Sequence, residues 1–191
     1  MRYLIVCGGK IDKEFGLNEI KTDGIDAIIA ADSGMDFLYE NGVTPDIIVG
    51  DFDSTTTNAL EYFERKGQTE IRRLNPIKDD TDTEYAIRLA ISEGARSIVL
   101  LGATGSRIDH VLGNISLLGI GLESGTDISI IDTNNRIRMA DKPVTIEKSA
   151  QYGRFVSLIA LTDDNEVSLK GFKYPVTDYS FDRFYIAWHI Q

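Results

Sequence analysis

The stretch Ser97-Ile-Val-Leu-Leu101-Gly-Ala-Thr-Gly105-Ser-Arg-Ile-Asp-His110 passes from an apolar run, through a loop with two glycines, into a segment of helical period. The apolar run has the length of a buried strand. In residues 107–118, apolar side chains recur at helical spacing and form one stripe: Ile108, Val111, Leu112, Ile115 and Leu118. A buried strand followed directly by an amphipathic helix is the repeating unit of a parallel α/β sheet.

The same alternation runs back to the start of the sequence. Four more apolar runs are predicted strands: Tyr3–Cys7, Ala27–Ala31, Asp46–Val49 and Glu70–Leu74. Segments of helical period predict helices between them: Ile11–Lys21, Ser33–Glu40, Thr55–Lys66 and Asp82–Glu93. We therefore predict a mostly parallel α/β sheet in this part of the chain.

The pattern changes near Ser124, where runs of period two, separated by turn residues, replace the helical segments. These runs are predicted strands: Asp127–Ile131, Arg136–Met139, Val144–Glu147, Phe155–Leu161, Glu166–Leu169 and the alternating tail Phe181–Ile190. Such a change of period indicates a second, all-β unit. The sequence thus predicts two domains, an α/β domain over residues 1–124 and an all-β domain over residues 125–191.

The acidic side chains are unevenly distributed. The chain of 191 residues carries 30 acidic and 20 basic side chains, a formal net charge of −10. The whole excess lies between Thr22 and Glu64, a window with ten acids and no base. Surfaces that bind nucleic acids cluster Lys and Arg against the phosphates, so this distribution argues against a nucleic-acid partner.

The sequence also bears on the compartment. No apolar stretch approaches the ~20 residues of a membrane helix, and residues 1–9 lack the length and cleavage site of a signal peptide. Cys7 lies in an apolar run with no activating His or Lys beside it, which predicts a buried, inert thiol. We expect a cytoplasmic protein without a membrane partner.

Unusual polar loops follow four of the predicted strands: Asp32-Ser-Gly34, Gly50-Asp-Phe-Asp-Ser54, Lys78-Asp-Asp-Thr-Asp82 and the loop from Gly102 to His110. Ligands bind parallel sheets outside the carboxyl ends of the strands, so we expect these loops to meet at one edge. Six aspartates would converge there: Asp32, Asp51, Asp53, Asp79, Asp80 and Asp82.

Such a cluster favours a bound cation, because mutual repulsion raises the pKa of neighbouring carboxyl groups. Oxygen donors without His or Cys favour Mg²⁺, which fills its remaining positions with water and substrate phosphates. Each aspartate could instead cap the helix that follows it. This alternative is strongest for Asp32 and weakest for the pair in Asp51-Phe-Asp53.

Other residues near this edge are suited to phosphate. Thr81 and Glu84 have capping-box spacing, which predicts a helix whose N-terminal N–H groups point at the edge. Lys78 could add a positive charge, with a solvated lysine as the alternative. The loop Gly102-Ala-Thr-Gly105 permits close backbone approach but lacks the Gly-Lys-Ser/Thr ending of a P-loop.

The helix after this loop carries further candidates. Arg107, His110 and Asn114 fall at i, i+3 and i+7 and are predicted to share one face, with Asp109 on the other side. Arg107 can bind phosphate oxygens bidentately. His110 could equally be a hydrogen-bonded structural histidine.

Four motifs in this order resemble the thiamine pyrophosphokinase family: Asp32-Ser-Gly, Pro45-Asp-Ile-Ile-Val-Gly-Asp-Phe-Asp-Ser54, Lys78-Asp-Asp-Thr-Asp82, and Gly102 to His110 with Asn114. Later, Gly171-Phe-Lys-Tyr174-Pro175 resembles the signature of the family's C-terminal domain. The resemblance implies a homodimer in which an α/β domain binds Mg–ATP and a β-sandwich domain helps to hold thiamine at a site shared by both subunits. The implied reaction transfers the pyrophosphoryl unit of ATP to the hydroxyl of thiamine, giving thiamine diphosphate and AMP.

The resemblance also implies roles for individual residues. Asp51, Asp53 and Asp82 would be the catalytic carboxylates that hold Mg²⁺. A larger group would bind ATP: Asp32 at the cleft floor, Lys78, Asp79, Thr81, Arg107, Asp109, His110 and Asn114. Thiamine would contact Ser168 and Tyr174.

Two alternative functions stay open. The loop Asp51-Phe-Asp-Ser-Thr55 resembles the nucleophile loop of haloacid-dehalogenase phosphohydrolases, whose first aspartate forms an aspartyl phosphate. Here, however, the loop follows the third strand rather than opening the fold. The tail from Asp178 to Gln191 lacks the Gly/Ser-rich stretch and Ser-Asn pair with which the family continues. The second alternative is therefore a thiamine- or nucleotide-binding protein without turnover.

Overall fold

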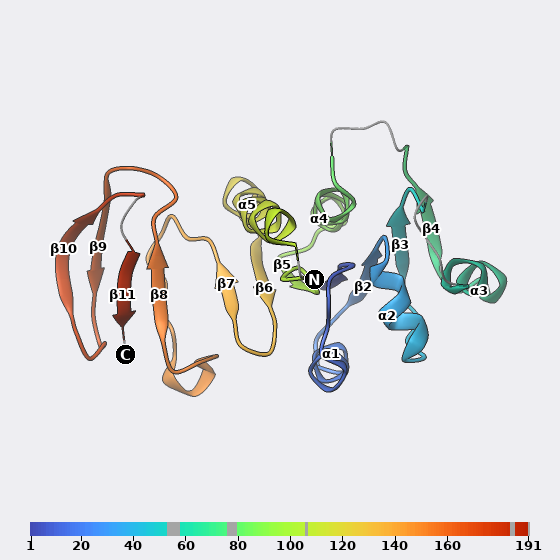
Figure 1. The fold of residues 1–191 in the computed structure, drawn as a ribbon, viewed down its shortest axis with the longest axis horizontal. Helices are drawn as coiled ribbons and strands as arrows, with labels where there is room; N and C mark the ends of the chain where they lie inside the picture. Colours follow the sequence, from blue (N-terminus) through green and yellow to red (C-terminus); the bar gives the residue numbers. More distant parts are fainter. Residues whose placement is uncertain (53–57, 76–79, 106, 184–185, 191) are drawn as a thin grey trace. The chain divides into compact units, whose positions relative to one another are not determined.

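The computed structural model of the chain describes residues 1–52, 58–75, 80–105, 107–183 and 186–190. The chain forms two compact units, which we call the first unit (Met1–Val144) and the second unit (Thr145–Gln191). The first unit is built on one large sheet, and the second on two small antiparallel sheets (Figure 1).

The sheet of the first unit has the strand order β4-β3-β2-β1-β5-β6-β7. Its strands are β1 (Arg2–Val6), β2 (Ala27–Ala31), β3 (Ile47–Gly50), β4 (Glu70–Arg73), β5 (Ser97–Leu101), β6 (Asp127–Ile131) and β7 (Arg136–Arg138). Strands β1 to β6 are parallel, and β7 pairs antiparallel with β6. The direction of strand addition reverses between β1 and β5, the switch point beside which doubly wound sheets bind ligands.

Helices cover both faces of this sheet (Figure 1). They are α1 (Lys13–Ile20), α2 (Gly34–Glu40), α3 (Ala59–Lys66), α4 (Asp82–Ser92) and α5 (Ile108–Ser124). Alternate residues of a strand point to opposite faces. Accordingly, Ile5 belongs to the core beneath α4 and α5, whereas Leu4 and Val6 belong to the core beneath α2 and α3.

The second unit contains β8 (Val156–Ile159), paired with β11 (Ile186–Ile190), and β9 (Asn165–Leu169), paired with β10 (Val176–Phe181). A short 3-10 helix, Lys148–Ala150, precedes them. Among the side chains described in this unit, Ala160 alone is buried.

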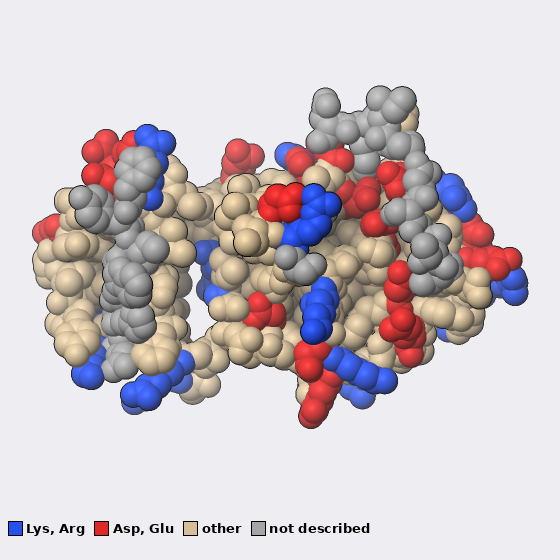
Figure 2. Space-filling view, in the orientation of Figure 1, with Lys and Arg blue, Asp and Glu red and all other residues tan. Residues whose placement is uncertain are grey.

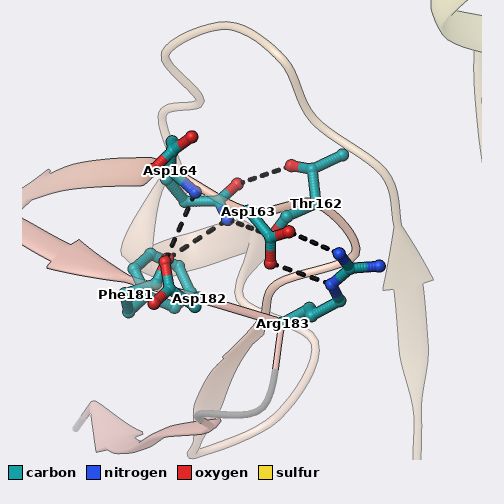
Figure 3. Close-up of polar contacts among 7 residues, drawn as sticks. Thr162, Asp163, Asp164, Phe181, Asp182 and Arg183 are labelled. Atoms are coloured by element: carbon teal, nitrogen blue, oxygen red, sulfur yellow. Dashed lines mark hydrogen bonds and ion pairs between the residues drawn. The ribbon is translucent and has the colours of Figure 1, made fainter.

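Polar contacts join the loop between β8 and β9 to the chain after β10 (Figure 3). The guanidinium of Arg183 donates to both carboxylate oxygens of Asp163, at 2.8 and 2.5 Å. The backbone N–H of Asp164 donates to Asp182 Oδ1 at 3.4 Å. The amide of Asn165 donates to the Phe181 carbonyl at 3.2 Å. These contacts hold residues 181–183, where the C-terminal tail begins, against residues 163–165.

The predicted fold class is confirmed: a mostly parallel sheet with helices precedes a small antiparallel C-terminal unit. The predicted strands Ala27–Ala31 and Ser97–Leu101 agree with β2 and β5 to the residue. Cys7 is buried, as its apolar neighbours predict. None of the helices within the described residues is long and apolar enough to cross a membrane.

The structure divides the chain at a different place from the predicted boundary near Ser124. Strands β6 and β7 belong to the first unit, because β6 pairs with β5 over its whole length. Period two identifies a strand but does not say which sheet it joins. Helix α5 and β6 therefore complete a last parallel crossover, and the boundary falls after Val144.

Three local predictions are wrong. Residues 144–147, predicted as a strand, have no regular secondary structure. Strand β10 was absent from the prediction, which placed a single run over Phe181–Ile190 instead. The predicted stripe of α5 packs on the core at Leu118, which is buried, and at Ile115, which is partly buried, whereas Ile108 and Leu112 are 75% and 60% exposed. The first turns of α5 extend past the core.

Candidate active site

Three carboxylates lie together at the carboxyl end of the sheet. Asp32 follows β2, Asp51 follows the neighbouring strand β3, and Asp82 is the first residue of α4. One carboxylate oxygen from each lies within 4.8 Å of the other two. Acidic side chains are gathered on this part of the first unit, around α4 and β3 (Figure 2). These three aspartates, predicted to meet at this edge, therefore do lie together there.

Asp32 carries an oxygen that the fold leaves without a partner. Its Oδ1 atom is buried and accepts no hydrogen bond from the described residues. Burial raises the pKa of Asp32; the N–H of Ser33 opposes this rise, and the charges of Asp82, Asp51 and Asp36 add to it. A buried acceptor without a partner is unfavourable. A hard divalent cation would satisfy Oδ1 and offset two of the three carboxylate charges, so this donor set fits Mg²⁺.

The backbone at the two loops is unusual. Asp32 has a φ of 49° and Phe52 a φ of 60°, both in the left-handed region. That region costs a residue with a Cβ about 1 kcal/mol or more. Strain of this kind is concentrated at functional sites, where the surrounding structure over-determines the backbone. In both loops it turns the chain sharply at or beside a carboxylate of the cluster.

Close packing against β1 explains the glycine in the motif Asp32-Ser-Gly34. A Cβ atom on Gly34 would lie 1.9 Å from the carbonyl oxygen of Val6, so only glycine fits there. Helix α2 thus begins directly against β1. This close approach places Asp32 at the end of β2 with its side chain toward the cluster.

Helix α4 begins as the capping motif predicts. The Oγ1 atom of Thr81 accepts a hydrogen bond from the N–H of Glu84 at 3.1 Å. The carboxylate of Glu84 pairs with Arg88, at 2.7 and 2.9 Å, rather than with the N-cap backbone. The first-turn N–H groups of this helix begin at Asp82, which belongs to the cluster.

Arg107 and Asp109 form a pair that the helical pattern did not predict. The Nη2 and Nε atoms of Arg107 donate to the Asp109 carboxylate at 2.6 and 3.2 Å, and both side chains are exposed. The Arg107 guanidinium lowers the pKa of Asp109 to about 2. Arg107 is the N-cap residue and has extended dihedrals, so helical spacing does not govern its direction. His110 is exposed in the first turn of α5.

Asn114 binds the protein itself. Its Nδ2 atom donates to the carbonyl oxygen of Ala103 at 2.8 Å, which fastens α5 to the loop after β5.

In the second unit, the Oγ atom of Ser168 donates to Asp178 Oδ1 at 3.0 Å and accepts from the Asp178 N–H at 2.9 Å. Tyr174 is 59% exposed.

The structure thus brings Asp32, Asp51 and Asp82 together. Asp53, Lys78 and Asp79 lie outside the described residues. Sequence reasoning missed Asp132, which follows β6 and accepts a hydrogen bond from Thr104 at 2.8 Å. Its position directly after a strand is the same signal that identified the other loops. It was overlooked because its strand was assigned to the second domain.

Two acids of the acidic window serve the fold instead. Asp26 Oδ2 accepts the N–H of Arg2, and Asp46 Oδ2 accepts the N–H of Ile28, both at 2.7 Å. Both acids precede strands, so they lie at the amino edge of the sheet, opposite the cluster. They satisfy backbone donors at the start of β1 and β2.

The fold and the site together define a doubly wound α/β protein with an acidic edge suited to a divalent metal, followed by a small β unit. Two family models match the chain: "Thiamin pyrophosphokinase, catalytic domain" over residues 21–130 and "Thiamin pyrophosphokinase, vitamin B1 binding domain" over residues 143–186. The chain belongs to the thiamine pyrophosphokinase family.

Individual relatives agree with this assignment. The thiamine pyrophosphokinase of Bacillus subtilis is 36% identical over 152 residues, which cover 78% of this chain and 70% of that protein. The crystal structure of a Bacillus subtilis thiamine pyrophosphokinase superposes with a TM-score of 0.79 at 30% identity, covering 94% of this chain and 83% of the other. That of Geobacillus thermodenitrificans gives 0.79 at 29%, covering 96% and 84%.

Proposed function

We propose that this chain is a magnesium-dependent thiamine pyrophosphokinase, which transfers the pyrophosphoryl unit of ATP to the hydroxyl of thiamine and releases AMP. The observation that carries the proposal is the cluster of Asp32, Asp51 and Asp82, with its buried, unpartnered Oδ1 atom. Membership of the family supplies the reaction.

Asp32, Asp51 and Asp82 would hold the metal, and Asp53 is a fourth candidate from the sequence. Bound there, Mg²⁺ would offset the charge of the phosphate oxygens and of the carboxylates. Asp32 was assigned from the sequence to ATP at the cleft floor. Its distance to the other two carboxylates and its unpartnered oxygen support a place among the metal ligands instead.

The nucleotide phosphates would lie between the start of α4 and the start of α5. Thr81 holds the first turn of α4, so its N–H groups are ordered before the substrate arrives. In the proposal, Lys78 and Asp79 also bind the nucleotide on the side of α4. On the other side, Asp109 occupies two donors of Arg107 and leaves the rest of the guanidinium for phosphate. His110 would contact the same nucleotide.

Transfer of this kind depends mainly on positioning and charge stabilisation. The thiamine hydroxyl would attack the β-phosphorus in line with the departing AMP, without a covalent intermediate. Arg107 would stabilise the charge that develops on the phosphoryl oxygens. One carboxylate of the cluster would accept the hydroxyl proton.

We further propose that the second unit binds thiamine through Ser168 and Tyr174 and associates with a second copy of the chain. Large apolar side chains are exposed in this unit: Phe155, Ile159, Leu161, Tyr174 and Tyr179. A unit of this size, whose described side chains bury only Ala160, has little core with which to stabilise itself. A homodimer would cover these side chains.

One assay separates the proposal from its alternatives. The purified protein is incubated with Mg–ATP, with and without thiamine, while AMP and thiamine diphosphate are measured. Thiamine-dependent AMP formation, abolished by chelating the metal, supports the proposal. Phosphate release from simple phosphate esters would favour a phosphohydrolase, and binding without turnover a sensor. We place the enzyme in the cytoplasm, where a buried free thiol such as Cys7 needs no disulfide partner.

A further inference from the structure

The loop Gly102-Ala-Thr-Gly105 is held at three successive residues by three different elements. The carbonyl of Gly102 accepts the N–H of Gly9, which follows β1, at 3.0 Å. The carbonyl of Ala103 accepts from Asn114 of α5 at 2.8 Å. The hydroxyl of Thr104 donates to Asp132 Oδ2, after β6, at 2.8 Å. The loop is therefore fixed before any ligand binds.

Asp132 is itself immobilised by the tight turn between β6 and β7. Its Oδ1 atom accepts the backbone N–H groups of Asn134 and Asn135, at 2.8 and 2.7 Å, and the Asn135 amide at 3.0 Å. Burial disfavours its charge, but the hydrogen bonds from Asn134, Asn135 and Thr104 prevail and lower the pKa of Asp132. Asp132 is thus a rigid, ionised acceptor.

The inner side of the loop is packed against the chain after β1. A Cβ atom on Gly9 would lie 2.2 Å from the Gly102 carbonyl oxygen and 3.0 Å from the Cα of Gly105. The loop cannot move closer to β1, so the contact of Thr104 with Asp132 restrains it on the side of β6. Because the Thr104 hydroxyl proton points at Asp132, this hydroxyl does not donate to a phosphate.

We propose that Asp132 is a positioning residue for the nucleotide: through Thr104 it fixes the loop that leads to Arg107, so that the guanidinium is already placed where the phosphates bind. This inference rests on the proposed function. Asn114, assigned to ATP from the sequence, acts in the same way through Ala103. Neither residue needs to touch the substrate.

The test compares Thr104→Val with Thr104→Ser in the full-length protein. Valine keeps the size of the side chain and removes the donor, whereas serine keeps the donor. Loss of one ordering hydrogen bond should raise the KM for ATP about five- to tenfold. We expect kcat to fall as well, because Arg107 also stabilises the developing charge, whereas the KM for thiamine should change less than about twofold, because Thr104 acts through the nucleotide side of the site. Thr104→Ser should restore the wild-type KM.

Thr69→Val is the matched control. Thr69 also donates a partly buried hydrogen bond, to the Pro45 carbonyl at 2.8 Å, but it precedes β4 at the amino edge of the sheet. If lost stability alone raised the KM for ATP, Thr69→Val would raise it too. Calorimetric titration of each variant with Mg–ATP, without thiamine, should show weaker binding of Mg–ATP for Thr104→Val and unchanged binding for Thr69→Val.

Asp132→Ala is the second variant, and it should weaken the binding of ATP at least as much as Thr104→Val does. If it fails to fold, the Thr104 variants still decide the question. The inference is overturned if the wild type is active and Thr104→Val leaves the KM for ATP unchanged. It is also overturned if Thr69→Val raises the KM for ATP as much as Thr104→Val does. In both cases the proposed function stands. A wild type that forms no AMP overturns both.

Discussion

The two units of the chain differ most in what they bury. The first unit places nearly every residue of its central strands in one of two cores, and Phe63, Leu4, Ile5 and Leu100 are fully enclosed. In the second unit β8 and β9 alternate between exposed and half-buried residues, and Ile159 is 65% exposed.

This contrast separates two sources of stability. The first unit has a core of its own, which can hold the carboxylate cluster against its own repulsion. The second unit has apolar side chains in the right pattern but nothing within its described residues to cover them. Its order must come from other contacts, and a second copy of the chain is the partner that we propose.

The largest expected effect tests whether the chemistry belongs to the first unit. Asp51→Asn removes one charge from the cluster, and we expect pyrophosphoryl transfer to fall at least ~100-fold. The far-ultraviolet circular dichroism should be unchanged, because asparagine has the same size.

Asp163→Asn is the control in the second unit, where the Asp163 carboxylate pairs with the exposed Arg183. Its activity should stay within about twofold of the wild type. Full activity in Asp51→Asn would contradict the metal assignment.

Two phenylalanines test the difference in burial directly. Phe63 is fully buried and Phe155 is 49% exposed. Phe63→Ala should lower the free energy of unfolding by about 3–5 kcal/mol, whereas Phe155→Ala should lower it by less than ~1 kcal/mol in the monomer. Urea unfolding at low protein concentration measures both. Equal losses at the two sites would mean that the second unit is as well packed as the first.

Cysteine labelling gives a third comparison. Burial raises the pKa of the Cys7 thiol to about 11, so little thiolate is present at neutral pH. We expect Cys7 to react with iodoacetamide at least ~10-fold more slowly than an exposed thiol. Ile159→Cys provides that exposed thiol in the second unit. Its protection at high protein concentration, with fast labelling on dilution, would support a covering second copy.

The smallest effect concerns Asp109. The pKa of Asp109 is lowered from 3.8 to about 2, chiefly by Arg107. A lowered pKa means that the pairing stabilises the folded state above about pH 4 and that this contribution is lost as pH falls through about 2. A carbon-13 NMR titration should find the low value and, in Arg107→Gln, a return toward 3.8. An unshifted pKa in the wild type would show that the pair does not persist in solution.

Much of the first unit could be predicted from the sequence, because buried parallel strands are short apolar runs. Residues 97–101 and the loop after them identified β5 to the residue and the start of its helix, which continues past the predicted end to Ser124. The same pattern could not assign β6, since alternation looks alike in either sheet. That single error moved the boundary and hid Asp132.

At the site, the position of Asp32, Asp51 and Asp82 in loops that follow strands was enough to predict that they lie together. Spacing failed for Arg107, because its backbone is extended and helical periodicity begins only after it. The roles of individual carboxylates depend on burial, and burial cannot be read from spacing. Asp32 illustrates this, because its unpartnered oxygen is visible only in the folded chain.

The edges of the large sheet have a consequence for aggregation. An open sheet ends in rows of backbone N–H and C=O groups that can recruit a strand from another molecule. Here the edge strands are β4 and β7, of four and three residues, and their exposed positions are charged: Glu70, Arg73, Arg136 and Arg138. Short, charged edges disfavour such pairing. If copies of the chain associate through the second unit, as we propose, these edges would keep their large sheets from joining into fibres.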